Sequence, residues 1–194
     1  MKDIKKGIFS PSWLVIWGTI PAALIGVKFG DQLEEFLGKP LIVATMMVLV
    51  GGLFIIMENI SKKDRNLENL TFADSIVIGL SQVVALIPGT SRSGITIIAG
   101  LGRGLKREAA VEFSFLLSLV IIAGASLLKV PKLLSQNMTS PEWLYLGLAF
   151  LTAAASGFWA ISFLMKFIKT KSLKPFAYYR FCLAAVIVIY YLVA

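Results

Sequence analysis

A short polar segment, PGTSRSGIT (88–96), carries the side chains best suited to chemistry. Thr90, Ser91 and Ser93 supply hydroxyl groups, and either serine could cap a helix that starts here. The first turn of such a helix offers free N–H groups and the positive end of its dipole. Arg92 adds a planar, permanently charged guanidinium that can bind a phosphate through two hydrogen bonds. Together these groups predict an anion site, with phosphate as its ligand.

The same segment has a plainer interpretation, as a Pro-Gly turn whose arginine extends to water beside the lipid. It lacks the GxxxxGK[ST] pattern of nucleotide-binding loops. A serine without a neighbouring base is also a weak nucleophile. Pro88 is expected to end one helix, and Gly89 to let the chain turn sharply. The residues expected to bind phosphate through this turn are Gly89, Thr90, Ser93 and Gly94.

The composition indicates an integral membrane protein. Of the 194 residues, 57% are hydrophobic and 15% charged, whereas soluble domains average about 25% charged residues. The mean hydropathy is +0.82. The chain has no histidine, which excludes histidine acid–base chemistry. Its single cysteine excludes an internal disulfide, and the two counts together exclude a zinc site of Cys and His ligands. No metal-ligand set is identified in the sequence.

Continuous apolar runs predict an all-α polytopic protein with five transmembrane helices in a single integral membrane domain, 1–194. The predicted spans are Ser12–Val27, Pro40–Met57, Ala109–Leu128, Trp143–Met165 and Phe176–Ala194. No cleaved signal peptide is expected.

The remaining apolar stretch, at about 71–103, predicts a re-entrant helix hairpin. Its second leg, Ile95–Leu101, reaches only about 10 Å at 1.5 Å per residue, so it cannot cross a core of about 30 Å. The alternative is a first leg, Thr71–Ile87, that crosses alone. A hairpin places thirteen Lys and Arg on one face and four on the other, whereas a single crossing gives eight against ten. The positive-inside rule favours the hairpin, with the N-terminus in the cytoplasm and the C-terminus outside.

The segments SQVVALIPGTSRSGITI and GLKREAAVEFSFLLSL resemble the undecaprenyl-diphosphate phosphatases of bacteria, the bacitracin-resistance family. The resemblance extends to KSLKPFAYYRF and covers essentially the whole chain. It implies an enzyme of the bacterial inner membrane that hydrolyses an isoprenoid lipid diphosphate, and thereby recycles the carrier lipid for peptidoglycan synthesis. It also implies a fold of two inverted repeats whose re-entrant tips meet inside the bilayer, so this chain would hold a partial inverted-repeat architecture.

On the matching positions, the resemblance implies that Ser91, Arg92 and Thr96 form the catalytic site. Arg92 would hold the diphosphate, Ser91 would donate to a phosphate oxygen or act as nucleophile, and Thr96 would line the site. The family also has an N-terminal re-entrant segment with a glutamate pair and an SSTGH stretch, and this sequence lacks both motifs. A divalent cation, Mg²⁺ or Ca²⁺, is therefore implied by the family, whereas its ligands are not found in this chain.

Four polar residues outside the motif need an explanation. Gln82 could face the site or bond to a neighbouring helix, and Glu112 could face the cavity, pair with Arg180 or lie at the interface. Asp74 is expected to be an early-turn acid favoured by the helix dipole rather than a catalytic group.

Two other functions stay open from the sequence: a non-catalytic protein that binds lipid phosphate, and a lipid flippase or transporter. A homodimer is a further open expectation. The basic loops are explained by orientation in the membrane, so no nucleic-acid partner is expected.

Overall fold

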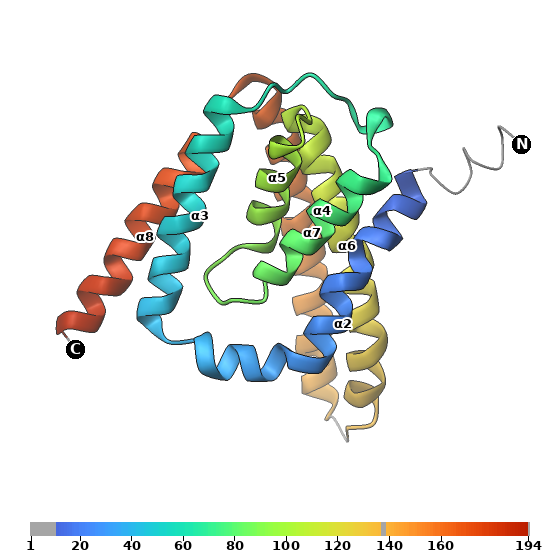
Figure 1. Cartoon of the computed structure of the whole chain (residues 1–194). Coiled ribbons are helices and arrows are strands. Elements are labelled where there is room, and N and C mark those ends of the chain that lie inside the picture. The colour runs from blue at the N-terminus through green and yellow to red at the C-terminus, as the bar shows by residue number, and fades with distance from the viewer. Residues whose placement is uncertain (1–10, 137–138, 194) are drawn as a thin grey trace, which may run out of the picture. The chain divides into compact units, whose positions relative to one another are not determined.

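The computed structural model describes residues 11–136 and 139–193, which are helical with no β-strand (Figure 1). Five long helices are apolar enough to cross a membrane: α2 (Pro11–Leu37), α3 (Pro40–Ile60), α6 (Arg107–Leu134), α7 (Ser140–Thr170) and α8 (Lys174–Val193). These correspond to the five predicted spans, so the all-α membrane class is confirmed. The predicted cytoplasmic N-terminus and Ala194, the predicted end of the last span, lie outside the described residues.

The long helices extend beyond the spans predicted from hydropathy. The first predicted span ends at Val27, whereas α2 continues through Pro21 to Leu37. The helix α7 begins earlier than predicted, because Thr139 and Glu142 form a capping box ahead of the apolar run. Hydropathy locates the apolar part of a helix, whereas capping side chains and polar turns set where the helix begins and ends.

The chain divides into two compact units. One unit comprises Met1–Ile121 and Ser172–Ala194, and the other comprises Ile122–Lys171. The polar segment PGTSRSGIT lies in the first unit, in which α3 packs along α8 and α2 packs along α4 (Phe72–Val84). The second unit holds the end of α6 and all of α7, and the candidate membrane window of α7 has no buried residues.

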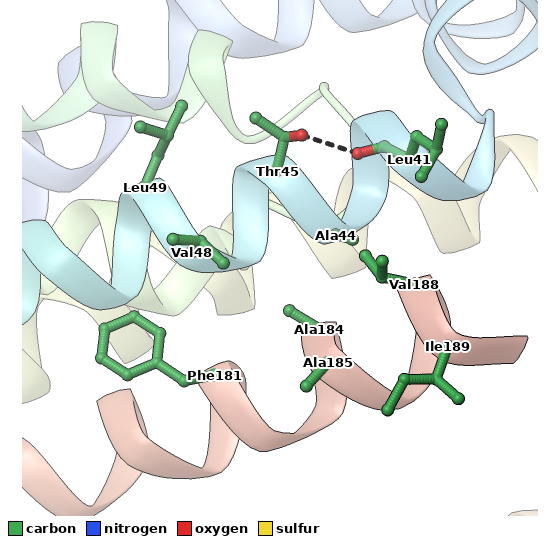
Figure 2. A pocket seen from close by; sticks show the side chains of 10 residues that line it. All are labelled: Leu41, Ala44, Thr45, Val48, Leu49, Phe181, Ala184, Ala185, Val188 and Ile189. Atoms are coloured by element: carbon green, nitrogen blue, oxygen red, sulfur yellow. Dashed lines mark hydrogen bonds between the residues drawn. The ribbon is translucent and has the colours of Figure 1, made fainter. Parts of the chain in front are cut away.

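Between α3 and α8 lies an open apolar cavity of about 510 Å³ (Figure 2). Thr45 is its one lining residue with a hydroxyl, and that hydroxyl donates to the Leu41 carbonyl at 2.7 Å. Phe181, from α8, would contact a Cβ added at Gly51, so the two helices approach closely here. The cavity therefore has no free polar group that could bind an anion. Its apolar surface suits lipid chains.

Two short helices, α4 and α5 (Arg92–Gly102), form an adjacent pair joined by a turn that includes PGTS (88–91), and the following RSG begins α5. The α4 helix begins with a capping box, in which Thr71 and Asp74 satisfy each other's backbone N–H groups. Asp74 is therefore an early-turn acid, as the sequence predicts. The α5 helix begins at Ser91, whose hydroxyl accepts a hydrogen bond from the Gly94 N–H at 3.2 Å. Of the two serines that could cap this helix, Ser91 is the one that does.

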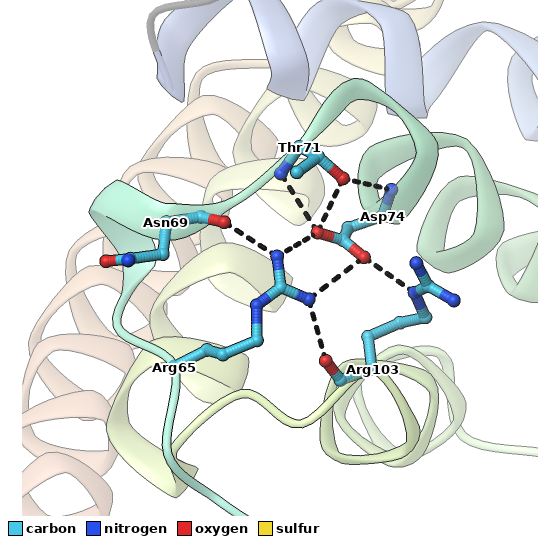
Figure 3. A network of polar contacts seen from close by, with 5 residues as sticks. All are labelled: Arg65, Asn69, Thr71, Asp74 and Arg103. Atoms are coloured by element: carbon cyan, nitrogen blue, oxygen red, sulfur yellow. Dashed lines mark hydrogen bonds and ion pairs between the residues drawn. The ribbon is translucent and has the colours of Figure 1, made fainter.

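Charged groups join the two ends of this helix pair (Figure 3). Asp74 is fully buried and accepts hydrogen bonds from Arg103 Nε at 2.6 Å and Arg65 Nη2 at 2.6 Å. Arg65 also donates to the carbonyls of Asn69 and Arg103, at 2.7 and 2.8 Å. Since Asp74 lies in the first turn of α4 and Arg103 caps the end of α5, the pair is closed at its base.

Candidate functional site

The turn between α4 and α5 is held in a conformation that most residues avoid. Gly89 has φ +89°, and Ser91, a non-glycine residue, has φ +69°. A Cβ added at Gly89 would lie 2.5 Å from the Val43 carbonyl oxygen of α3. Gly89 is therefore required both by its backbone conformation and by close packing, in agreement with the sharp turn expected at this position.

Arg92 lies at the open side of this turn. It is the first residue of α5 and is exposed. Its guanidinium has no hydrogen bond or ion pair among the described residues, in contrast to those of Arg65, Arg103 and Arg107, which pair with carboxylates. An unpaired guanidinium beside a helix N-terminus is an arrangement that attracts an anion.

Ser91 is exposed and next to Arg92 in the chain. Its oxygen already accepts from the Gly94 N–H, so its own proton is free to be donated to a ligand. Ser93 is half-buried, and its carbonyl accepts from Thr96 Oγ1 at 3.1 Å. Ser91 is therefore exposed, as Arg92 is, whereas Ser93 is partly covered.

Thr96 and Gly94 lie on the inner side of α5. Thr96 is 1% exposed, and its hydroxyl is 2.7 Å from Ser114 Oγ of α6. It also donates toward the Arg92 and Ser93 carbonyls of its own helix. Gly94 is buried, and a Cβ there would lie 3.1 Å from the Phe54 ring. These two residues hold α5 against its neighbours, and the Thr96 hydroxyl is not on the open surface of the turn.

Two buried polar groups lie on the inner side of the same turn. Thr90 is 0% exposed, and its Oγ1 has no hydrogen-bond partner among the described residues. Arg180 of α8 is 8% exposed and donates from Nη2 to the Gly89 carbonyl at 2.7 Å. The turn therefore has one guanidinium on its open side and a second one behind it.

The other residues predicted to surround the site are placed away from it. Gln82 is buried and donates to the Gly18 carbonyl of α2 at 3.2 Å, so it makes the helix–helix bond that the sequence left as an alternative. Glu112 is exposed and forms no salt bridge with Arg180 among the described residues. Of the alternatives for Glu112, pairing with Arg180 is therefore not seen among the described residues, because the Arg180 guanidinium binds backbone carbonyls of α3 and of the turn.

The sequence did not indicate Ser114 or the partners of Asp74. Ser114 is one of several serines in an apolar helix, and nothing local distinguishes it from its neighbours. Burial alone would raise the pKa of Asp74, but hydrogen bonds from Arg65, Thr71 and Arg103 outweigh it and hold that pKa well below its usual range. The hydrogen bond between Arg65 and Asp74 also raises the pKa of Arg65.

Comparison with known proteins identifies what this chain is similar to. A family model described as "Bacitracin resistance protein BacA" matches residues 2–186. A protein of Rubrobacter xylanophilus named "Undecaprenyl-diphosphatase" is 43% identical over 186 residues, which is 96% of this chain and 68% of that protein. Proteins of the same name from Acetivibrio thermocellus and Enterococcus faecalis are 42% and 39% identical. They match 98% and 96% of this chain, and 71% and 68% of their own lengths.

Proposed function

The chain belongs to the bacitracin resistance protein BacA family, and we propose that it is an undecaprenyl-diphosphatase with its phosphate site at the α4–α5 turn. The reaction is hydrolysis of a lipid diphosphate. Water adds to the terminal phosphorus, the bridging P–O bond breaks, and the products are the lipid monophosphate and inorganic phosphate. Bacitracin resistance is a general property implied by the family.

The observation that carries this proposal is the exposed guanidinium of Arg92, the first residue of α5, which has no partner within residues 11–136 and 139–193. Its charge neutralises phosphate oxygens, and its planar fork can bind two of them. The Ser91 hydroxyl donates to a third phosphate oxygen. Its oxygen accepts from the Gly94 N–H, and this bond leaves the hydroxyl proton free for the ligand. Serine as a nucleophile is less favoured, because it makes no hydrogen bond to a base among the described residues.

A divalent cation, Mg²⁺ or Ca²⁺, is part of the family expectation. Among the described residues, no three of His, Cys, Asp or Glu lie together as ligands. Glu58 has one buried oxygen, Oε2, without a partner, but Lys63 and Arg107 already pair with that carboxylate. These cations disfavour a metal there, so the described residues do not form the cation site, and no step of the reaction is assigned to it.

The placement in the membrane is part of the proposal. The α4 and α5 helices have 13 and 11 residues, about 20 and 16 Å long, so neither spans a core of about 30 Å. Because Asp74 and Arg103 join the two open ends, both ends lie at one face. This supports a hairpin that enters and leaves on the cytoplasmic side, with the C-terminus outside.

The test is phosphate release from undecaprenyl diphosphate by the purified chain in detergent, with Mg²⁺ or Ca²⁺. We expect Arg92→Gln to lower the rate at least about 100-fold, the typical cost of losing a group that stabilises developing charge. Lys62→Gln is the matched control, because Lys62 is exposed and carries the same charge. Equal rates for wild type and Arg92→Gln contradict the site.

Two alternative functions give different results in that assay. A non-catalytic lipid-phosphate-binding protein binds the lipid diphosphate but releases no phosphate. A flippase moves the lipid between the leaflets of a vesicle without cleaving it. Size measurement in detergent, at several protein concentrations, tests the homodimer separately.

A further inference from the structure

The C-terminal end of α7 carries three lysines without an acidic neighbour. Lys166, Lys169 and Lys171 are all exposed, and all belong to the unit Ile122–Lys171. Lys166 and Lys169 are three residues apart in the helix and therefore share a face, and Lys171 caps the same helix end. No Asp or Glu follows Glu142 in the sequence. The three lysines form one positive patch, here called the lysine patch.

No ion pair of the described residues neutralises the lysine patch. The salt bridges there use Glu58 and Asp74, and both bind other cations. The negative end of a helix dipole amounts to about half a charge, so it offsets only a small part of three positive ones. The positive-inside rule explains on which side lysines are retained during insertion, but it leaves their charge in the folded protein uncompensated. The patch therefore attracts an anion from its surroundings.

The length of α7 places the lysine patch at the level of the lipid headgroups. Its 31 residues extend about 46 Å, whereas the hydrocarbon core is about 30 Å thick. Trp143 is exposed near the start of the helix, where it suits the opposite interface. Lys166 lies about 35 Å further along the helix, or about 33 Å further along the bilayer normal at a tilt of about 20°. The patch therefore lies beyond the core.

The helix surface that leads to the patch is apolar and exposed. Trp159 and Phe163 precede the first lysine by one to two turns, and they are 78% and 59% exposed. The candidate membrane window of α7 has no buried residues. An acidic protein or a nucleic acid would have to displace lipid from this surface. The anions nearest to the lysines are therefore the phosphates of phospholipids.

We propose that the lysine patch binds the headgroups of anionic phospholipids and that these lipids hold the end of α7 at a fixed depth in the bilayer. Each ammonium group is a compact charge with three donors, which suits the phosphate oxygens of a headgroup. Clusters of basic residues directly after a spanning helix attract anionic lipid in this way. The inference concerns a surface away from the α4–α5 turn, and it does not depend on hydrolysis of the lipid diphosphate.

The experiment counts lipids bound to the purified full chain in a neutral detergent by native mass spectrometry. Phosphatidylglycerol is compared with phosphatidylcholine of the same acyl chains. The variant combines Lys166→Gln, Lys169→Gln and Lys171→Gln. One lysine near a membrane surface gives about a fivefold preference for anionic lipid, so we expect the variant to bind phosphatidylglycerol about 100-fold more weakly. Its affinity for phosphatidylcholine should change less than about threefold. Salt at about 1 M should reduce the difference between the lipids in wild type.

The control variant removes the same number of charges elsewhere. It combines Lys39→Gln, Lys129→Gln and Lys132→Gln, all at exposed positions. Lys129 and Lys132 lie near the end of α6, in the same unit as the patch. We expect the control to lower the affinity for phosphatidylglycerol less than about fivefold, so a general loss of charge is distinguished from loss of the patch.

Three results would overturn the inference. One is equal binding of the two lipids by wild type, and another is an equal loss in the patch variant and the control. The third is binding of polyglutamate, an acidic peptide, as tightly as phosphatidylglycerol and its loss in the patch variant, which would assign the patch to a protein partner. If thermal unfolding shows that the triple variant does not fold, Lys169→Gln alone decides, with an expected loss of about fivefold.

Discussion

Arg103 Nε lies 2.6 Å from Asp74 Oδ1, and this contact joins the end of α5 to the beginning of α4. The carboxylate is fully buried, while Arg103 is 41% exposed at its side chain. Arg65 binds the second oxygen and the Arg103 carbonyl, so the loop before α4 is part of the same cluster. The base of the helix pair is therefore fixed by charge, whereas its tip is fixed by backbone packing at Gly89.

The first prediction concerns the stability of this base. Asp74→Asn removes the charge that both arginines share, and we expect the free energy of unfolding to fall by about 3 kcal/mol, the lower end for a broken buried pair, since Arg103 is partly exposed. Thermal and denaturant unfolding in detergent measure it. The control is Asp64→Asn, because Asp64 is an exposed acid of the same loop. Equal stability of the two variants contradicts the prediction.

The second prediction concerns pH. Asp74 lies outside the five candidate spanning helices, and its pKa in the folded protein is below the value of about 3.9 for an unfolded chain. The ionised form therefore stabilises the fold above that value, and the stabilisation is lost as the pH falls toward the folded pKa. We expect the gap in melting temperature between wild type and Asp74→Asn to be constant near pH 7 and to narrow below about pH 4. A gap that does not change with pH argues against an ionised Asp74.

The sequence predicts the helices of this protein better than the contacts between them. Apolar runs locate the spanning helices because helix formation in lipid depends mainly on local hydrophobicity. The polar turn is also predictable from local sequence, since Gly89 readily adopts the positive φ that the turn requires. By contrast, Thr96 and Ser114 are 18 residues apart, and Arg180 is 91 residues from Gly89. Such pairs depend on which faces of the helices pack against each other. A single sequence does not indicate which helix faces these are.

The third prediction tests the contact between α5 and α6. We expect Thr96→Val and Ser114→Ala each to lower the free energy of unfolding by about 1–3 kcal/mol, because each leaves a buried hydroxyl or carbonyl less satisfied. The double variant should lose less than the sum, with a coupling of about 0.5–3 kcal/mol. Denaturant unfolding of the four proteins measures the cycle. Additive losses would mean that the hydroxyl pair does not contribute as a pair.

The fourth prediction uses Gly89 to test whether the tip needs its observed conformation. Gly89→Ala adds a methyl group at φ +89°, where it also meets the Val43 carbonyl oxygen at 2.5 Å. The backbone strain costs on the order of 1 kcal/mol, and the clash adds to it because a helix carbonyl cannot easily move. We expect the turn that carries Ser91 and Arg92 to shift, so that phosphate release falls sharply, while the base at Asp74 persists.

Gly52→Ala provides the matched comparison for that variant. Gly52 is helical, and a Cβ there meets nothing within 4 Å, so alanine should be neutral or slightly stabilising. Phosphate release and the melting temperature are measured for both variants. Because the predicted defect of Gly89→Ala is local, activity should fall by a larger factor than a loss of folded protein explains. Full activity in Gly89→Ala would show that the site tolerates a different turn, and that the strained backbone at Ser91 is not needed to present Arg92 to the phosphate.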